Sequence, residues 1–93
     1  MYICWIDGSE RRSHKLADGK TIIGRRNDSD IVIGNSQVSR RHAQIEAASD
    51  TYTITDLDST NGTYINDLRV ERGQVRPGDL LRVGRVLFQI SRS

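Results

Sequence analysis

The chain has 93 residues, of which 35% are hydrophobic and 28% are charged. This length suits one domain, 1–93, with a modest core, and the composition excludes a disordered chain. The formal net charge of +2 is too small to indicate a nucleic-acid-binding protein, so we expect no nucleic-acid partner.

The sequence also bears on location and cofactors. No apolar run approaches the roughly 20 residues of a membrane span, and MYICWIDGSE has no basic leader before an apolar stretch. We therefore expect a cytoplasmic protein without a membrane partner. Cys4 is the only cysteine, which excludes an internal disulfide, and we expect it to be a buried structural thiol. Cys4, His14 and His42 are too few and too scattered for a zinc site, so we expect no metal or other cofactor.

Short strand-like segments recur along the chain, separated by Gly, Asn, Asp or Ser. Segments such as HAQIEA and VLFQI alternate apolar and polar residues, as strands with one wet face do. We find no helical apolar stripe and expect little or no helix. In chain order, the predicted strands are Tyr2–Ile6, Lys15–Leu16, Thr21–Gly24, Ile31–Ile33, His42–Ala47, Thr51–Thr55, Thr63–Ile65, Leu68–Val70, Leu80–Val83 and Val86–Ile90. Many short strands at close spacing predict an all-β antiparallel sandwich or barrel.

The segment DSTNGTYIN, at 58–66, predicts a turn between two of these strands. Asn-Gly between alternating segments is the strongest short-range hairpin signal, so we expect a two-residue hairpin turn at Asn61 and Gly62. Such a turn leaves Ser59 and Thr60 as two further hydroxyls at the loop tip. Hydroxyls in turns often bond their own backbone, so this segment alone does not establish a binding role.

The predicted loops hold side chains that suit a phosphate dianion and a peptide backbone. They supply guanidiniums, two hydroxyls and one carboxamide, from Arg25, Ser39, Arg40, Thr60 and Asn61. An arginine can bond two phosphate oxygens in a fork, and charge-assisted hydrogen bonds contribute about 1.5 to 3 kcal/mol each. Sequence spacing alone does not place these loops at one end of a sandwich.

Four motifs in order resemble the signature of the forkhead-associated (FHA) domain. They are Gly-Arg at 24–25, Ser-Arg-Arg-His at 39–42, STNGTYIN at 59–66 and RPGDLLRVG at 76–84. The resemblance covers nearly the whole chain, and four ordered motifs are far more specific than one. It implies an antiparallel β-sandwich of about eleven short strands, with loops at one apex that bind phosphothreonine peptides in Ser/Thr kinase signalling.

The resemblance implies ligand contacts residue by residue. Arg25 and Ser39 would hold the phosphate, and Thr60 would add a hydroxyl beside it. Asn61 would bond the peptide main chain near the phosphothreonine. Arg40 follows the serine at a position where family members often contact the ligand, although asparagine is commoner there.

Other residues of the motifs would support the site. The resemblance implies that His42 ties loops together, that Asn66 braces the binding loop, and that Gly24 and Gly62 belong to the same structural support. Asp67 stands where the family often has glycine, and it tolerates the left-handed conformation less easily.

The family prefers phosphothreonine to phosphoserine and reads the residue three places after it. Burial of the extra methyl group contributes about 0.8 kcal/mol. We expect the preference at the position three places after the phosphothreonine to depend on Gln37 and on the turn 82–85, but the sequence does not name the preferred residue.

Three other functions have weaker support. A hydrolase would use Ser39 and His42 with Asp56 or Asp58, but Ser39 lacks a nucleophile elbow, so we expect no enzyme. A nucleic-acid module fits poorly with the low charge and few aromatic residues. A phosphate-independent docking module, which would bind partners through a face of the sandwich, would survive loss of Arg25. We expect a monomer whose partner is a phosphothreonine-containing protein or peptide.

Overall fold

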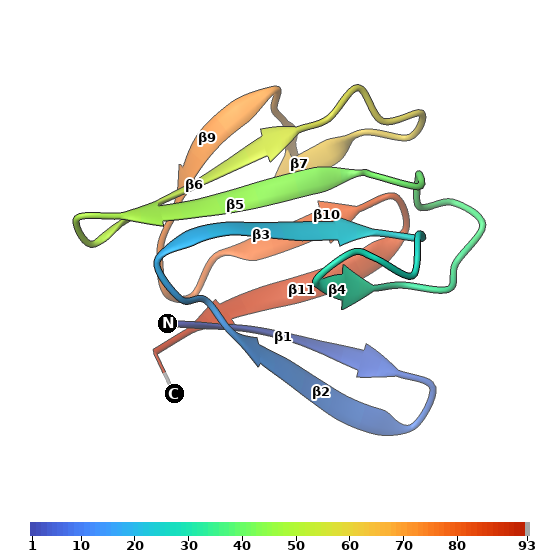
Figure 1. Ribbon diagram of the computed structural model, residues 1–93, viewed down its shortest axis with the longest axis horizontal. Coiled ribbons are helices and arrows are strands. Elements are labelled where there is room, and N and C mark those ends of the chain that lie inside the picture. Colours follow the sequence, from blue (N-terminus) through green and yellow to red (C-terminus); the bar gives the residue numbers. More distant parts are fainter. Residues whose placement is uncertain (93) are drawn as a thin grey trace.

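The computed structural model describes residues 1–92, which form eleven strands in two sheets (Figure 1). One sheet has the order β2-β1-β11-β10-β7-β8 and the other the order β4-β3-β5-β6-β9. The strands are β1 (Tyr2–Asp7), β2 (Glu10–Lys15), β3 (Gly19–Gly24), β4 (Ile31–Val32), β5 (Ala43–Ala48), β6 (Thr51–Asp56), β7 (Thr63–Ile65), β8 (Leu68–Arg69), β9 (Arg72–Val75), β10 (Leu80–Val83) and β11 (Val86–Ser91). The prediction of an all-β sandwich of about eleven short strands with little or no helix is confirmed.

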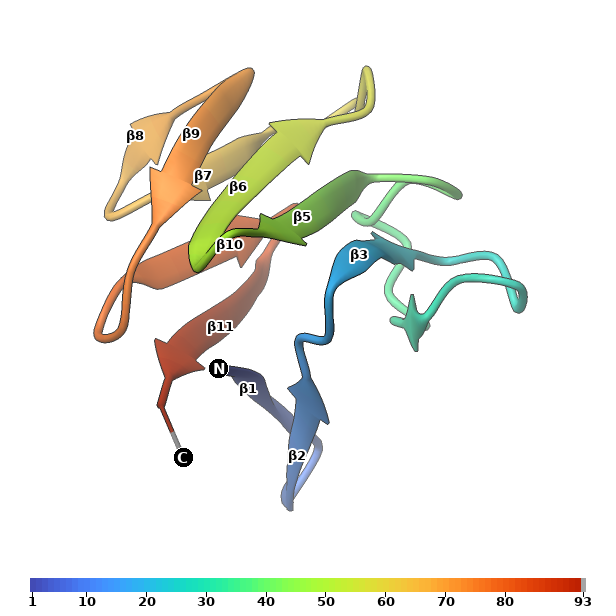
Figure 2. The same cartoon turned by 60° about the vertical axis from the view of Figure 1, so that its left-hand side comes forward.

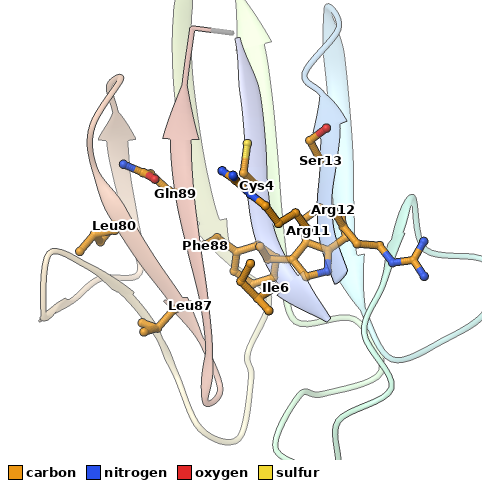
Figure 3. A pocket seen from close by; sticks show the side chains of 10 residues that line it. Cys4, Ile6, Arg11, Arg12, Ser13, Leu80, Leu87, Phe88 and Gln89 are labelled. Carbon is orange, nitrogen blue, oxygen red and sulfur yellow. The ribbon is translucent and has the colours of Figure 1, made fainter. Parts of the chain in front are cut away.

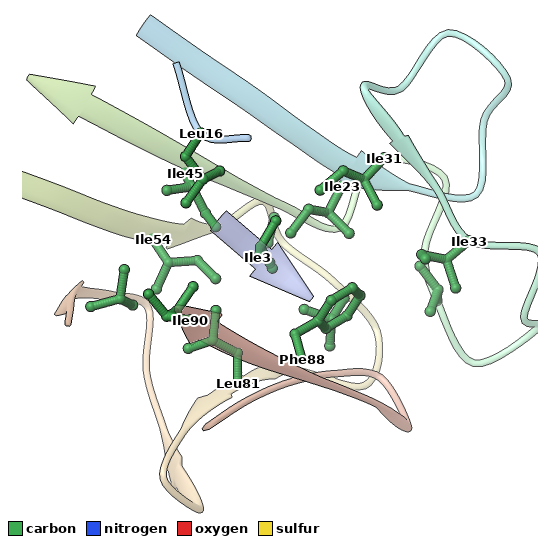
Figure 4. Close-up of a cluster of buried hydrophobic side chains, with 14 residues drawn as sticks. Ile3, Leu16, Ile23, Ile31, Ile33, Ile45, Ile54, Leu81, Phe88 and Ile90 are labelled. Carbon is green, nitrogen blue, oxygen red and sulfur yellow. The ribbon is translucent and has the colours of Figure 1, made fainter. Parts of the chain in front are cut away.

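The two sheets enclose one core of apolar side chains, most of them aliphatic (Figure 4). Ile3 and Phe88 enter it from the six-stranded sheet, and Ile23, Ile45 and Ile54 from the five-stranded sheet, each at most 1% exposed. Burial of each such side chain contributes about 1.5 to 3 kcal/mol, so alternation along the strands decides which faces meet.

The alternation of β1 corrects the expectation for Cys4. Because Ile3 is buried in the core, the next residue points to the other face, and Cys4 is only partly buried. Trp5 turns back toward the core, where its ring centroid lies 5.5 Å from that of Phe88.

Two strands differ from the sequence prediction because they lie at sheet edges. β2 was expected only at its last residue, and β9 was not expected at all. The sequence of β2 is ERRSHK, without an apolar residue, and β9 contains a glycine and buries only Val75. An edge strand has a single neighbour and is commonly charged, so apolar alternation does not mark it.

The expectation of purely antiparallel pairing is wrong at one place, the pair β3–β4. Ile23 pairs with Ile31 and Gly24 with Val32 in parallel register. The loop 25–30 brings the chain back to the side of β3, so that β4 runs in the same direction as β3. Within it, Asp30 Oδ2 accepts a hydrogen bond of 2.8 Å from the N–H of Ile22. This bond starts β4 beside β3 in the same direction.

The predicted hairpin at Asn61 and Gly62 is also wrong. β6 pairs with β5 and β9, whereas β7 pairs with β10 and β8, so the two strands belong to different sheets. Of these two residues, only Gly62 has a positive φ, of 89°, whereas a type I′ turn needs a positive φ at both. The loop 57–62 therefore crosses from one sheet to the other. The prediction failed because alternation indicates a half-buried strand but does not identify the strand with which it pairs.

This crossing places several loops at one end of the sandwich, which we call the loop end. It comprises the loops 25–30, 33–42 and 57–62 and the turn 84–85, on the right-hand side of Figure 1. The view in Figure 2 shows the loop between β3 and β5 on the same side as the one after β6. Both chain ends lie away from these loops in Figure 1.

The two-residue turn between β7 and β8 yields a first prediction. Asn66 and Asp67 have φ values of 48° and 70°, as a type I′ turn requires. Asp67→Gly should raise the free energy of unfolding by about 0.5 kcal/mol, because glycine adopts this conformation without strain. Urea denaturation measures the change. Asp67→Val serves as the opposite control, and an equal stability of the two variants would contradict the prediction.

Candidate functional site

The site begins where β3 ends, at Gly24 and Arg25. The N–H of Arg25 donates to the carbonyl of Ser39 at 3.0 Å, and that of Arg26 donates to the carbonyl of Arg40 at 3.1 Å. A Cβ on Gly24 would overlap the carbonyl oxygen of Arg40. Glycine is therefore required for the loop 33–42 to lie against the end of β3.

The side chain of Arg25 is held by one of its own donors. Its Nε donates to the carbonyl of Val38 at 3.0 Å. Within residues 1–92, the three ion pairs involve Arg12 and Arg26 but not Arg25. The fork of terminal N–H groups on this exposed side chain therefore remains available to a ligand.

His42 is fully buried and joins two loops. Its Nδ1 accepts a hydrogen bond of 3.0 Å from the N–H of Ser39, so its Nε2 carries the proton and donates to the carbonyl of Gly62 at 2.8 Å. Because both ring nitrogens bind backbone groups, His42 is not placed to take a proton from the Ser39 hydroxyl. This geometry disfavours the hydrolase.

The hydroxyl of Ser39 faces the loop 57–62. Its Oγ accepts a hydrogen bond of 3.1 Å from the N–H of Thr60. The hydroxyl hydrogen of Ser39 is then still free to be donated. Thr60 itself is exposed at the loop tip.

The two surplus hydroxyls at the loop tip have different surroundings. Ser59 Oγ donates to Asp56 Oδ1 at 2.5 Å and accepts from the N–H of Gly62 at 3.0 Å. Asp56 also accepts from the N–H of Ser59 at 3.1 Å and from Thr63 Oγ1 at 2.7 Å. Ser59 therefore holds the loop together, and Thr60 supplies the hydroxyl at its tip.

These bonds also set the charge state of Asp56. Burial raises the pKa of its carboxyl group, but hydrogen bonds from the Ser59 hydroxyl, the Thr63 hydroxyl and the Ser59 N–H lower it, as does an electrostatic interaction with His42. The lowering effects prevail, so the pKa lies below the ordinary value of 3.8 and Asp56 is a carboxylate at neutral pH.

Asn61 is oriented by a neighbouring loop. Its Nδ2 donates to the carbonyl of Gln37 at 2.8 Å, which leaves Oδ1 as an acceptor for a ligand N–H. Gly84 lets the backbone of Gln37 lie close to the turn 84–85, because a Cβ at position 84 would lie only 2.5 Å from the Gln37 carbonyl oxygen. Sequence reasoning missed this role of Gly84, although its place at the end of RPGDLLRVG was a usable signal.

The five predicted ligand-contacting residues lie together around one pocket of about 420 Å³ at the loop end; they are Arg25, Ser39, Arg40, Thr60 and Asn61. Arg41, which was not predicted, adds a third guanidinium to the lining, and Asp58 is its one carboxylate. The pocket therefore favours an anion.

Two residues lie elsewhere than expected. Asn66 sits at the far end of β7, where its Nδ2 donates to Asp79 Oδ1 and its Oδ1 accepts from the N–H of Leu80, both at 3.0 Å. It braces the turn before β10 and not the loop 57–62. Arg82 lies within β10, with its guanidinium carbon 3.8 Å from the centroid of the Tyr64 ring, outside the pocket lining.

The described residues contain no cluster of three or more His, Cys, Asp and Glu side chains that could hold a metal ion. Across residues 1–92 there is also no helix long and apolar enough to span a membrane.

Comparisons with known proteins agree with this geometry. The profile of the FHA domain matches residues 21–84. FhaA of Mycobacterium tuberculosis is 37% identical over 79 residues, which make up 85% of this chain and 15% of FhaA. The oxoglutarate dehydrogenase inhibitor of Corynebacterium jeikeium is 38% identical over 79 residues, or 84% of this chain and 55% of that protein. The chain thus spans well under two thirds of these relatives.

Solved structures match almost the whole chain, and two of those that cover 99% of it are reported with phosphorylation-dependent binding in their descriptions. One, described as part of a study of phosphothreonine-dependent FHA domain interactions, has a TM-score of 0.91 and 32% identity over 96% of its own length. The other is EmbR of Mycobacterium tuberculosis in complex with a low-affinity phosphopeptide, with a TM-score of 0.84 and 34% identity over 25% of its length.

The close contact at Gly24 yields a second prediction. Gly24→Ala should lower the free energy of unfolding by about 1 to 3 kcal/mol, because the added Cβ must displace the carbonyl of Arg40. Thermal denaturation followed by circular dichroism measures this loss. Gly34→Ala is the matched control, since a Cβ there has no neighbour within 4 Å. Equal stability of the two variants would show that the contact relaxes without cost.

A third prediction follows from the lowered pKa of Asp56. A carboxyl whose pKa is lower in the folded state stabilises the fold above its unfolded pKa, and this contribution is lost as the pH falls through the folded pKa. Asp56→Asn should cost about 2 kcal/mol at pH 7, and the difference from wild type should shrink below about pH 4. Urea denaturation at a series of pH values tests this. Asp18→Asn, at an exposed site, is the control, and a difference that stays constant with pH would refute the assignment.

Proposed function

The chain belongs to the forkhead-associated (FHA) domain family, and from this we propose that it binds phosphothreonine peptides in the pocket at its loop end. One observation carries the proposal: the unpaired fork of Arg25 and the hydroxyls of Ser39 and Thr60 belong to a single pocket. FHA domains are a family of binding modules, and we propose no catalysis.

The pocket matches the charge of a phosphothreonine. The phosphate carries close to two negative charges at neutral pH, and the lining has three guanidiniums against one carboxylate. Arg25 donates its terminal N–H groups to two phosphate oxygens, and Ser39 donates its hydroxyl hydrogen to another. Charge-assisted bonds of this kind contribute about 1.5 to 3 kcal/mol each.

Thr60 and Asn61 extend the contact from phosphate to peptide. The exposed Thr60 donates its hydroxyl to the phosphate. The Asn61 side chain, fixed by its bond to the Gln37 carbonyl, presents Oδ1 to an N–H of the peptide main chain. A fixed carboxamide loses little rotamer freedom on binding, which favours affinity.

Arg40 and Arg41 set the charge around the phosphate. Both are exposed, both line the pocket, and neither takes part in the ion pairs found in residues 1–92. Arg40 contacts the ligand, and the pair favours peptides with few basic residues near the phosphothreonine.

Threonine is preferred to serine because the extra methyl group leaves water. Transfer of one methyl contributes about 0.8 kcal/mol, or about fourfold in affinity, and a closely fitting pocket contributes roughly 1 to 3 kcal/mol. Val38 is the one apolar residue of the pocket lining, and at 1% exposed it offers little surface to this group, so we expect the smaller of these preferences.

The protein acts as a monomeric reader of Ser/Thr kinase signalling in the cytoplasm, and its partner is a phosphothreonine-containing protein rather than a nucleic acid or a membrane. The relatives are longer than this chain, so the activity of the whole protein stays outside this proposal.

Fluorescence anisotropy with a degenerate phosphothreonine peptide library tests the function. Arg25→Ala should weaken binding at least a hundredfold, because it removes two charge-assisted bonds to the phosphate. Arg76→Ala, an exposed arginine in the turn after β9, is the matched control and should bind like wild type.

Phosphoserine and unphosphorylated libraries complete the measurement. Phosphoserine should bind more weakly than phosphothreonine, and the unphosphorylated library should not bind in this pocket. Wild-type affinity in Arg25→Ala would show that the phosphate site is misplaced, and equal binding of the phosphorylated and unphosphorylated libraries would favour the docking module instead.

A further inference from the structure

A continuous row of side chains crosses the outer face of the six-stranded sheet. The strand pairings align Arg69 with Tyr64, Tyr64 with Arg82, and Arg82 with Leu87. β1 pairs with β11 at Trp5 and Phe88, so the next residues along the two strands, Ile6 and Leu87, lie opposite each other. Ile6 in turn aligns with Arg11 on β2. Aligned residues share a face. We call this set the outer row: Arg69, Tyr64, Arg82, Leu87, Ile6 and Arg11.

The middle of the outer row is apolar and open to solvent. Ile6 is 59% exposed and Leu87 is 61% exposed, and the nearby Leu80 is 50% exposed. Ile6, Leu80 and Leu87 line a hollow of about 380 Å³ that runs over β1, β11 and β10 (Figure 3). Large aliphatic side chains gathered in this way mark an interaction surface more often than single ones do.

Three of the remaining four positions of the row are cationic, and the fourth is Tyr64. Arg11, Arg69 and Arg82 contribute three positive charges, and no carboxylate belongs to the row. Within residues 1–92 none of the three forms an ion pair, since those found involve Arg12 and Arg26. The guanidinium of Arg82 instead lies over the Tyr64 ring.

The outer face of the other sheet is different. There the pairings align Lys20 with Glu46, Glu46 with Thr53, and Thr53 with Gln74, so charges alternate in sign and hydroxyls replace aliphatic groups. Of the large exposed hydrophobic residues in 1–92, only Val32, on the short edge strand β4, belongs to this sheet. A solvated sheet face is ordinarily of this polar kind, and the outer row departs from it.

We propose that the outer row is a second docking surface, separate from the phosphate pocket, which binds an acidic and partly apolar segment of a partner protein. Charge complementarity identifies the occupant: carboxylates meet the three arginines, and apolar side chains enter the hollow between Ile6 and Leu87. Six strands about 4.8 Å apart make the row about 24 Å long, which matches about 16 residues of helix.

Two other occupants fit less well. A second copy of the chain in a symmetric dimer would bring the row against itself and place arginines opposite arginines. A lipid surface suits protruding apolar side chains, whereas here they line a hollow.

Titration of the ¹⁵N-labelled protein with synthetic peptides of about 16 residues, followed by amide chemical shifts, tests the proposal. One probe places Leu and Glu at helical spacing and a second alternates Val and Glu; both lack phosphate. Matched probes replace Glu by Lys, or the apolar residues by Ser. We expect the acidic apolar probes to shift amides of β1, β10 and β11 and to leave those of Ser39 and Thr60 unchanged.

Variants assign the contact to the row. The double variant Ile6→Ser, Leu87→Ser should bind the acidic apolar probes at least fivefold more weakly. Leu68→Ser is the control, because Leu68 is 68% exposed and lies outside the row. Arg11→Glu should lower the affinity for the same probes at least tenfold. Arg72→Glu, on the outer face of the other sheet, is the control. All four variants should keep wild-type phosphopeptide affinity, and Arg25→Ala should bind the acidic apolar probes like wild type. The loss of one binding site can therefore be distinguished from the loss of the other.

Several results would overturn the proposal. These are no shift in the row at millimolar probe, equal binding of the Lys probes, or equal loss in the control variants. Self-association in sedimentation experiments that Leu87→Ser abolishes would assign the row to a second copy. Binding to vesicles of phosphatidylglycerol and phosphatidylcholine without binding to either acidic peptide would assign it to a membrane.

Discussion

A buried imidazole joins the two sheets at their loop end. His42 precedes β5 of the five-stranded sheet, and its ring donates to the carbonyl of Gly62, which precedes β7 of the six-stranded sheet. On its other side the ring accepts the N–H of Ser39. A buried polar ring is tolerated only when its nitrogens are satisfied, so the loops 33–42 and 57–62 must keep this arrangement. The position of the pocket follows from it.

Sequence reasoning found the strands whose burial alternates and missed those without that pattern. The central strands β5 and β11 alternate buried with more exposed residues, whereas the edge strand β2 is polar throughout. The loop after β6 was read as a hairpin because Asn-Gly is a local signal, and local signals do not say in which sheet the next strand pairs. The predicted ligand-contacting residues came from ordered motifs. The carbonyls of Gln37 and Val38, which orient Asn61 and Arg25, could not be found, because any residue type supplies a carbonyl.

The two basic surfaces differ in what surrounds their arginines. At the pocket, hydroxyls and a carboxamide accompany the guanidiniums, so the surface offers many directed donors and suits a compact anion. On the outer row, isoleucine, leucine and tyrosine accompany them, so the surface suits carboxylates spread along an apolar segment. The same charged group therefore suits two kinds of ligand in the two proposals, depending on its neighbours.

The carboxylate of Asp56 has one further consequence. It accepts three hydrogen bonds, all from groups of Ser59 and Thr63 within the protein. The loop that carries Thr60 and Asn61 is thus ordered during folding, before any ligand arrives. A preorganised loop spares the complex the entropic cost of ordering it. Association is then limited by encounter and orientation rather than by rearrangement, which suits a reader of short-lived marks.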